Sequence, residues 1–217
     1  RSSLPVGFVS EVLGEHLDPG IEIDIAVRNY GIPFQWSLEA EAETEAISTE
    51  VVNVPERIDL RSTPLITIDG EDARDFDDAV YAEKRSGGGY RVVVAIADVS
   101  HYVRLDSPLN EEAEERGTSV YFPHFVLPML PEALSNGLCS LNPHVDRLCM
   151  VCDLKLSRAG KVTGYEFYPA VMHSKARLTY TQVGRYFEGV TDAIPEDKTI
   201  HKSLNTLFQL YQTLKEL

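Results

Sequence analysis

The sequence predicts an α+β fold, in which helices pack on a mixed or antiparallel sheet that follows part of a small β domain. Apolar runs of strand length are separated by tight-turn residues through the middle of the chain, as at residues 64–68, 79–84 and 90–97. Such runs bounded by turn signals are typical of strands. Near the end, apolar residues recur at helical spacing instead, and strands followed by helices indicate the α+β class.

The first 36 residues are predicted to be the remnant of a small β domain. Residues 6–13 (VGFVSEVL) and 21–28 (IEIDIAVR) have strand patterns, and the second alternates Ile or Val with polar or small side chains. The Asp-Pro-Gly at 18–20 would form the turn before the second strand. Two or three strands do not close a core by themselves, so we expect this domain to be incomplete here.

Residues 37–57 (SLEAEAETEAISTEVVNVPER) are predicted to be an acidic connector between this domain and the rest. Positions 39–56 carry six glutamates and no basic residue. Ser37 is suited to cap a short helix, and we expect that helix to be solvated on the surface. The domain boundary is predicted in this segment.

Residues 58–217 are predicted to form the main domain. After the strand at 64–68, residues 79–84 and 90–97 form a hairpin around the turn at 86–89 (SGGG). A helix begins after Ser107, its cap, and runs through Arg116, with Gly117 as the stop.

The later elements follow from the same signals. They are an extended segment at 119–122, a helical turn at 132–136, paired strands at 147–157 and 163–173, and helices after them. The last helix carries a face of apolar residues that predicts packing, made of Leu204, Leu207, Phe208, Tyr211 and Leu214.

The charge of the chain argues, taken alone, against nucleic-acid binding. The net charge is −14, from 20 Lys and Arg against 34 Asp and Glu, and no basic patch stands out. Much of the negative charge lies in the connector and in one aspartate cluster, which bound cations would neutralise. Three cysteines suit a reducing cytoplasm better than a disulfide framework, and no apolar run approaches the roughly 18 residues of a membrane span.

The stretch IDGEDARDFDD, residues 68–78, crowds six carboxylates into ten positions beside two apolar segments. Like charges repel, and a partly buried carboxylate without a partner is costly, so a positive partner is expected. Asp69 ends a predicted strand, and Asp75 and Asp77 share a face of an extended segment. A loop that folds back would bring Asp78 to the same point. Four carboxylates suit a pair of Mg²⁺ or Mn²⁺ ions that clamps a phosphodiester.

The aspartate stretch has two other interpretations. An EF-hand calcium loop starting at Asp69 would need ligands where Ala73 and Val80 stand and a glycine where Arg74 stands, so it is rejected. An acidic loop with only caps and surface ion pairs remains open, although the flanking strands would hold the loop more rigidly than such a loop needs.

Four stretches together resemble the ribonuclease II/ribonuclease R (RNB) exoribonuclease family, most strongly its bacterial ribonuclease R members. They are residues 67–80 (TIDGEDARDFDDAV), 94–100 (VAIADVS), 116–123 (RGTSVYFP) and 128–141 (PMLPEALSNGLCSL). Each stretch alone is weak, but the combination is specific. The resemblance covers nearly the whole chain.

The resemblance implies a processive, metal-dependent 3′→5′ exoribonuclease that releases nucleoside 5′-monophosphates from single-stranded RNA during RNA turnover and quality control. Asp69, Asp75, Asp77 and Asp78 match the family's catalytic aspartates, which bind Mg²⁺, with Mn²⁺ as the alternative. Of these, Asp69 and Asp78 would be the firmest direct ligands, and Asp77 the most sensitive to loss. Tyr121 matches an aromatic that stacks on the 3′-terminal base.

The resemblance also implies a division of the chain. Residues 1–36 would be the end of a cold-shock domain, an OB-type β-barrel in which Phe34 and Trp36 could stack on bases. Residues 37–57 would be the acidic linker, and residues 58–217 the N-terminal part of the RNB catalytic domain. The family's catalytic domain is longer and includes a further arginine near the scissile phosphate, so we expect the 217-residue piece alone to be inactive or nearly so. The parent protein is expected to be a cytoplasmic monomer with no membrane contact and no small-molecule cofactor.

Two rival functions stay open at this point. One is a non-catalytic RNA-binding module that keeps the aspartates as relics, and the other is a structural module that binds divalent metal. Among the weaker candidate sites, Cys149 and Cys152 are expected to be core residues rather than zinc ligands. His101, beside Asp98, is expected to be structural or close to RNA.

Overall fold

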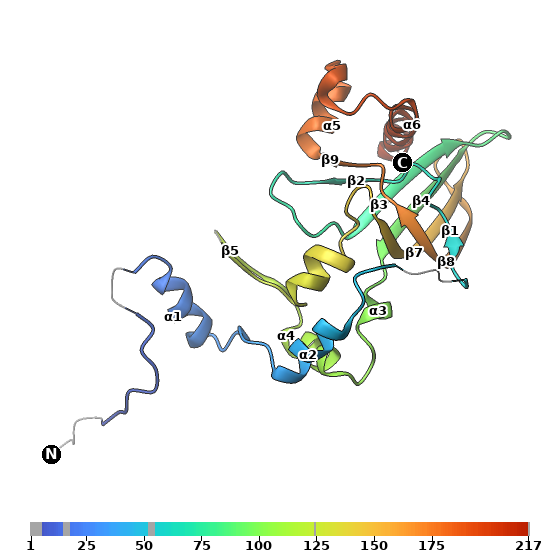
Figure 1. The fold of residues 1–217 in the computed structure, drawn as a ribbon. Coiled ribbons are helices and arrows are strands. Elements are labelled where there is room, and N and C mark those ends of the chain that lie inside the picture. The colour runs from blue at the N-terminus through green and yellow to red at the C-terminus, as the bar shows by residue number, and fades with distance from the viewer. Residues whose placement is uncertain (1–5, 15–17, 52–54, 124, 217) are drawn as a thin grey trace.

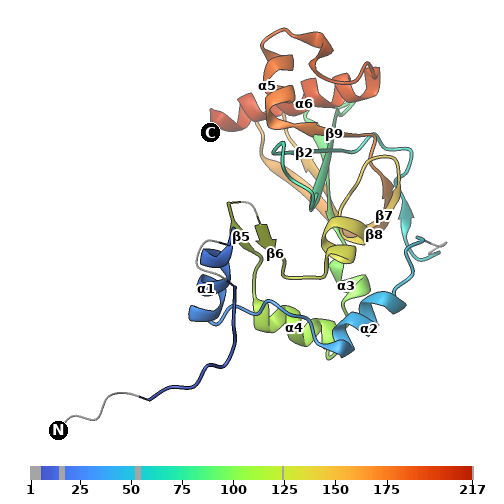
Figure 2. The same cartoon turned by 60° about the vertical axis from the view of Figure 1, so that its left-hand side comes forward.

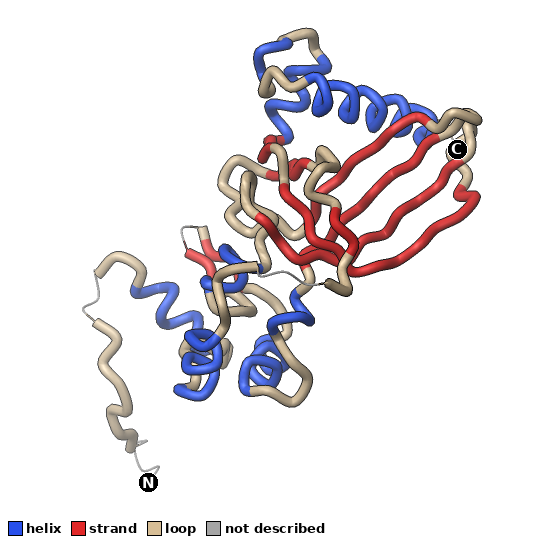
Figure 3. Tube along the Cα trace, turned by 45° about the vertical axis from the view of Figure 1, so that its right-hand side comes forward, coloured by secondary structure: helices blue, strands red, loops and turns tan. Residues whose placement is uncertain are grey.

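The computed structural model describes residues 6–14, 18–51, 55–123 and 125–216. A twisted sheet lies at its centre, and the N-terminal segment extends away from it (Figure 1). Two helices near the C-terminus cover one face of the sheet, and shorter helices lie on its other side (Figure 2). The longest of the helices runs along the sheet (Figure 3). The α+β class with a mixed sheet is therefore confirmed.

Within the described residues the main sheet has seven strands in the order β1-β8-β7-β4-β3-β2-β9. The β1–β8 and β2–β9 pairs are parallel and the other neighbours antiparallel. Strands β5 and β6 form a separate hairpin. The strands are β1 (Ile58–Asp59), β2 (Ile66–Asp69), β3 (Asp78–Lys84), β4 (Tyr90–Ala97), β5 (Val120–Phe122), β6 (Phe125–Leu127), β7 (Asp146–Leu156), β8 (Val162–His173) and β9 (Ala176–Thr179).

The helices fall before, between and after these strands. They are α1 (Ile21–Asn29), α2 (Leu38–Ala46), α3 (Val99–Tyr102), α4 (Pro108–Arg116), the π-helix η1 (Ala133–Leu138), α5 (Tyr180–Phe187), the short 3₁₀-helix η2 (Thr191–Ala193) and α6 (Lys198–Lys215). Among the helices of the described ranges, none is both long enough and apolar enough to cross a membrane.

The β3–β4 hairpin is closed by the glycine-rich turn that the sequence predicts. The Arg85 N–H donates to the Gly89 carbonyl over 3.1 Å, and Gly89 has a φ of +82°. A Cβ at Gly89 would lie 2.2 Å from the Leu156 carbonyl oxygen on the adjacent part of the sheet. Glycine is therefore required both by the left-handed backbone and by the close approach.

Alternate residues of the strands enter cores on opposite faces of the sheet. On one face Val93 belongs to the same buried cluster as Leu134 of η1 and Leu109 of α4. On the other face Leu178 of β9 belongs to a cluster with Leu204 of α6. Helices α5 and α6 cover this second face, so the aspartate-bearing strands β2 and β3 are packed on both sides.

The strand expected at residues 21–28 is wrong, because Ile21–Asn29 form helix α1. Glu22 and Asp24 lie in its first turn and Arg28 in its last, which suits the helix dipole. Arg28 also donates to Asp24 one turn earlier, over 3.2 Å. Residues 6–13, expected as the other strand, have no regular secondary structure. A strand needs a neighbour for its backbone groups, and the described residues before β1 contain none, whereas a helix satisfies its own.

Helix α2 confirms the capped helix expected in the acidic connector, but one of its faces is buried. The Ser37 hydroxyl accepts from the Ala40 N–H, and Ala40 is fully buried. Glu43 accepts the Leu109 N–H of α4 over 2.9 Å. An acidic residue thus satisfies one of the free N-terminal donors of the neighbouring helix, which is a structural use of this charge rather than solvation.

The other expected elements are confirmed within a residue or two at their ends. Helix α4 has the Ser107 cap, the proline in the first turn and the left-handed Gly117. The expected face of α6 is only partly buried: Leu204 is in the core, while Tyr211 and Leu214 are exposed. Strands β1 and β9 were not predicted, because each is short and gains its place only through a parallel partner far along the chain.

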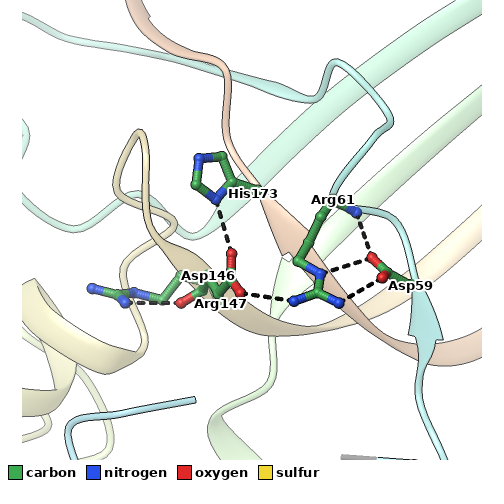
Figure 4. A network of polar contacts seen from close by, with 5 residues as sticks. All are labelled: Asp59, Arg61, Asp146, Arg147 and His173. Atoms are coloured by element: carbon green, nitrogen blue, oxygen red, sulfur yellow. Dashed lines mark hydrogen bonds and ion pairs between the residues drawn. The ribbon is translucent and has the colours of Figure 1, made fainter. Parts of the chain in front are cut away.

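A network of charged side chains joins the ends of β1, β7 and β8 (Figure 4). The Arg61 guanidinium lies 2.6 Å from a carboxylate oxygen of Asp59 and 3.2 Å from one of Asp146. The other Asp146 oxygen lies 2.8 Å from Nδ1 of His173. Burial acts to raise the pKa of Asp146, but the hydrogen bonds and charges of His173 and Arg61 outweigh it and lower the pKa.

Replacing Asp146 by asparagine is expected to destabilise the fold by about 0.5–1 kcal/mol at neutral pH, the usual size for a partly exposed ion pair. Because the folded-state pKa is lowered, this contribution is present above the ordinary aspartate pKa and is lost as the pH falls through the folded value. Urea unfolding from neutral pH to about pH 3 should show the two proteins converging. The exposed Asp192→Asn change is the control; a constant difference across the pH range would contradict the account.

Candidate functional site

The four predicted aspartates lie where β2 and β3 meet a single loop. Asp69 is the last residue of β2 and Asp78 the first of β3. The two strands are antiparallel, so these residues stand at the same end of the pair. Asp75 and Asp77 lie in the loop that joins β2 to β3. Figure 1 shows this loop beyond the ends of the two strands. The fold therefore brings together the residues that the sequence selects.

The centre of the loop is fixed by the buried Phe76. Its side chain is only 4% exposed and lies in the main core. Its N–H donates to the Ser140 hydroxyl over 2.9 Å, and its carbonyl accepts from the Leu141 N–H over 2.8 Å. The Ser140 hydroxyl in turn donates to the Arg74 carbonyl. With Phe76 inward, Asp75 and Asp77 on either side point outward, as the extended pattern predicts.

The aspartates after Phe76 are fixed to the central strands. The Asp77 carbonyl accepts the Ala97 N–H over 2.9 Å, and Asp78 pairs with Ile96 of β4. Both side chains are exposed, whereas Asp69 and Asp75 are half-buried. The backbone is thus held by core contacts, and only the carboxylates face outward.

The carboxylates repel one another, and this changes their acidity. Partial burial raises the pKa of Asp69, and the charges of Asp78 and Asp75 raise it further, while Arg177 opposes them. Desolvation and the charges of Asp75, Asp78 and Asp69 likewise raise the pKa of Asp77. The Asp77 side chain has a large accessible surface. Its desolvation therefore arises from protein atoms that surround the carboxylate without covering it. The loop therefore holds negative charge at a cost that a cation would relieve.

The donor set fits a divalent cation. One Asp69 oxygen, Oδ2, is buried without a hydrogen-bond partner. Across the described ranges none of the four aspartates lies in an ion pair with Lys, Arg or His. All the ligand atoms are hard carboxylate oxygens, which Mg²⁺ and Mn²⁺ prefer. With the side chains as they stand, the described residues contain no group of three or more His, Cys, Asp or Glu arranged to hold a metal ion.

Tyr121 reaches the same place from the β5–β6 hairpin. Tyr121 is 67% exposed, and its hydroxyl donates to Asp75 Oδ2 over 3.3 Å. Desolvation, and then the Asp75 charge, raise the pKa of this phenol, so it stays a hydrogen-bond donor. The structure thus places an exposed aromatic face beside the aspartates.

Of the two aromatic residues that the sequence offers for base stacking in the N-terminal segment, Phe34 is partly exposed and Trp36 is less available. Trp36 packs against the main core, and the Arg116 guanidinium lies 3.5 Å from its ring centroid. Arg116 also donates to the Pro33, Gln35 and Pro128 carbonyls. Trp36, through its contact with Arg116, therefore connects the N-terminal segment to Pro128, just after the β5–β6 hairpin. The sequence did not predict this structural role.

The weaker sequence candidates have structural surroundings. Cys149 is buried and Cys152 half-buried, and both thiols are free. Asp98 is buried and forms an ion pair with Arg57, and His101 lies 3.5 Å from the same guanidinium. Ser140 and Arg177 were missed by sequence reasoning. They hold the aspartate loop from positions more than 60 residues away, where no local pattern marks them.

Comparison with known proteins shows the family. The RNB domain matches residues 57–217, and the cold shock domain matches residues 1–37. The chain belongs to the RNB family. The expected strands of the first 36 residues are absent from their described part, but their relationship to the cold shock domain is supported by this match.

Two curated relatives are bacterial Ribonuclease R proteins. The chain is 54% identical to Ribonuclease R of Escherichia coli (strain K12), over 99% of this chain and 27% of that protein. It is 55% identical to Ribonuclease R of Vibrio cholerae, over 97% of this chain and 26% of that protein. The chain thus spans about a quarter of the length of these curated relatives.

Solved structures show the same fold. Mycoplasma genitalium RNase R in complex with double-stranded RNA is similar with a TM-score of 0.88 and 34% identity, over 95% of this chain and 37% of that one. Yeast Ssd1, described as a pseudonuclease, has a TM-score of 0.65 at 17% identity, over 93% of this chain and 25% of that one. The second likeness shows the fold alone, and a shared fold does not by itself decide function.

Replacing Asp77 by asparagine is expected to stabilise the protein at neutral pH in the presence of a chelator. The change removes one of four repelling charges, and two unit charges about 4 Å apart in water interact by about 1 kcal/mol. Because the folded-state pKa is raised, the charge costs stability above that pKa, and the gain should vanish below the ordinary aspartate pKa.

Chemical unfolding of the two proteins without divalent cations measures this difference. Asp72→Asn is the matched control, since Asp72 is exposed in the same loop but outside the quartet. A loss of stability in the Asp77 variant under these conditions would contradict the electrostatic account of the loop.

Proposed function

We propose that the protein to which this chain belongs is a processive, metal-dependent 3′→5′ exoribonuclease that hydrolyses single-stranded RNA to nucleoside 5′-monophosphates. One observation carries the proposal: Asp69, Asp75, Asp77 and Asp78 converge at one loop, and among the described residues none of them forms an ion pair with Lys, Arg or His. Family membership and the resemblance to Ribonuclease R support it. Such a protein would act in RNA turnover and quality control.

In this proposal the four aspartates hold Mg²⁺, with Mn²⁺ as the alternative. The buried, unpartnered Oδ2 of Asp69 and the carboxylate of Asp78 are direct ligands, and Asp75 and Asp77 act directly or through water. The metal, when bound, activates water and offsets the charge that develops on the phosphodiester. The chain itself keeps the ligands in place through Phe76, Ser140 and the central strands.

Tyr121 would bind the last base of the RNA. The exposed ring offers a stacking surface, and the hydrogen bond to Asp75 orients it toward the aspartates. Stacking on an aromatic face tolerates any base, which suits a processive enzyme that removes nucleotides regardless of sequence.

The chain divides, in this proposal, into the end of a cold-shock domain at 1–36, an acidic linker at 37–57 and the N-terminal part of the catalytic domain at 58–217. The matches to residues 1–37 and 57–217 support these boundaries. The partner is single-stranded RNA, and we propose a monomer without a small-molecule cofactor. The free thiols of the chain suit a reducing cytoplasm.

A non-catalytic RNA-binding or metal-binding module is the alternative. The fold is compatible with this alternative, because a shared fold does not by itself imply catalysis. The complete aspartate quartet favours catalysis. A module that only binds metal would show a Mn²⁺-dependent rise in melting temperature without RNA hydrolysis.

Asp77→Asn is expected to lower the rate of mononucleotide release by about 100-fold or more, the cost of losing about 3 kcal/mol of transition-state stabilisation. The assay uses the full-length protein, Mg²⁺ and 5′-labelled single-stranded RNA, resolved at single-nucleotide steps. A ladder shortening from the 3′ end supports the proposal. Asp72→Asn should behave as the unaltered protein; intact RNA with the unaltered protein would refute the nuclease function.

Tyr121→Ala is expected to weaken RNA binding by about 1–3 kcal/mol, or roughly 5- to 150-fold in Kd, because the stacked base loses its aromatic face. Tyr121→Phe keeps the ring and loses only the hydroxyl bonded to Asp75, so it should bind nearly as well. Fluorescence anisotropy with a catalytically inactive background measures both. Equal losses in the two variants would show that the hydroxyl, not stacking, matters.

A further inference from the structure

Arg177 lies under the aspartate loop although it is about 100 residues away in sequence. It belongs to β9, which runs parallel to β2, with Arg177 opposite Thr67 and Thr179 opposite Asp69. This register carries the half-buried Arg177 side chain toward the segment that follows Asp69. The pairing of β9 with β2 therefore places Arg177 against the aspartate loop.

The guanidinium contacts the backbone of the first half of the loop. Its Nη2 lies 2.6 Å from the Glu71 carbonyl oxygen, 3.2 Å from that of Gly70 and 3.3 Å from that of Ala73. A nitrogen with two hydrogens shares them among these three acceptors, and hydrogen bonds from a charged donor are the stronger kind. The three carbonyls are thereby turned toward one point beneath the loop.

The same side chain also contacts the second half of the loop. Its central carbon lies 5.0 Å from the ring centroid of Phe76, the residue between Asp75 and Asp77. Its charge is close enough to Asp69 to oppose the repulsion from Asp78 and Asp75. A single residue therefore joins both halves of the loop and offsets part of its negative charge.

Arg177 is placed to support the site rather than to bind RNA. Its Nη2 is committed to loop carbonyls, and its Nε is buried without a partner. No phosphate is needed to explain its position. Outer-shell partners that hydrogen-bond to metal ligands affect metal affinity by about 10- to 100-fold, and a residue that holds the ligand-bearing loop acts on the same ligand geometry.

We propose that Arg177 is a positioning residue that holds residues 70–76 in the shape in which the aspartates bind a divalent cation, and so sets the affinity for that cation. The inference rests on the proposed metal site and adds to it the residue that shapes it. It assigns no contact with RNA to Arg177.

Mn²⁺ binding to the full-length protein tests this directly, measured by calorimetry or by electron paramagnetic resonance. Arg177→Gln should raise the Kd for Mn²⁺ about tenfold or more, because the charge and the stacked plane are both lost. Arg177→Lys keeps the charge but has a shorter side chain without the planar guanidinium. Its Kd for Mn²⁺ should therefore rise about threefold, to a value between those of the unaltered protein and Arg177→Gln. Arg158→Gln is the control, since Arg158 is exposed beyond the opposite end of the strands.

Two further measurements distinguish a positioning role of Arg177 from a general loss of stability. Hydrogen exchange of the amides at 70–77 should increase in Arg177→Gln, while exchange in β4 stays unchanged. The maximal rate of RNA hydrolysis should recover largely at high Mn²⁺, because the ligands themselves remain. A rate that stays low at saturating metal would overturn the positioning role.

The remaining outcomes also decide the matter. A Kd for Mn²⁺ in Arg177→Gln within about twofold of the unaltered protein, with Asp77→Asn abolishing binding, overturns this inference and leaves the metal site standing. If Arg177→Gln does not fold, Arg177→Lys carries the test, and an unchanged Kd there overturns the inference. Absence of Mn²⁺ binding by the unaltered protein overturns the metal site and this inference together.

Discussion

The repulsion among four aspartates at one loop is the constraint on which the rest of the site depends. Left free, such a loop would turn its carboxylates apart in water. Here Phe76 is buried in the core between two of the aspartates, and Ser140 and Leu141 bond its backbone. The core contacts therefore supply the free energy that keeps the charges close, and the raised pKa of Asp69 and of Asp77 reflects first their desolvation and then the charges of the neighbouring aspartates.

Three parts of the surrounding fold contact this loop or its aspartates. The central hairpin fixes Asp77 and Asp78 through Ala97 and Ile96. The late strand β9 lies beside β2 and brings Arg177 beneath the loop. The β5–β6 hairpin, whose base Arg116 ties to the N-terminal segment, brings Tyr121 to Asp75. The contacts of Arg177 and Tyr121 join parts of the chain that are far apart in sequence.

Contacts between distant parts of the chain also explain which features the sequence predicts and which it misses. Local signals predict the hairpin around Gly89, the Ser107 cap and the aspartates themselves, because each depends on neighbouring residues. Contacts that close only in three dimensions, such as those of Ser140 and Arg177, leave no local pattern. Helix α1 was mistaken for a strand because isoleucines alternate there, while its charged ends and the lack of a pairing strand in the described segment favour a helix.

A crystal structure of the full-length protein with Mn²⁺, recorded with anomalous scattering at the manganese edge, tests the central claim most directly. The account predicts manganese about 2.0–2.2 Å from oxygens of Asp69 and Asp78, with Asp75 and Asp77 turned toward it and the backbone of residues 70–78 close to its present course. Only the carboxylates would rotate, because the loop is already held from behind. Manganese absent from this cluster, or bound after the loop has left Phe76 and Arg177, would contradict it.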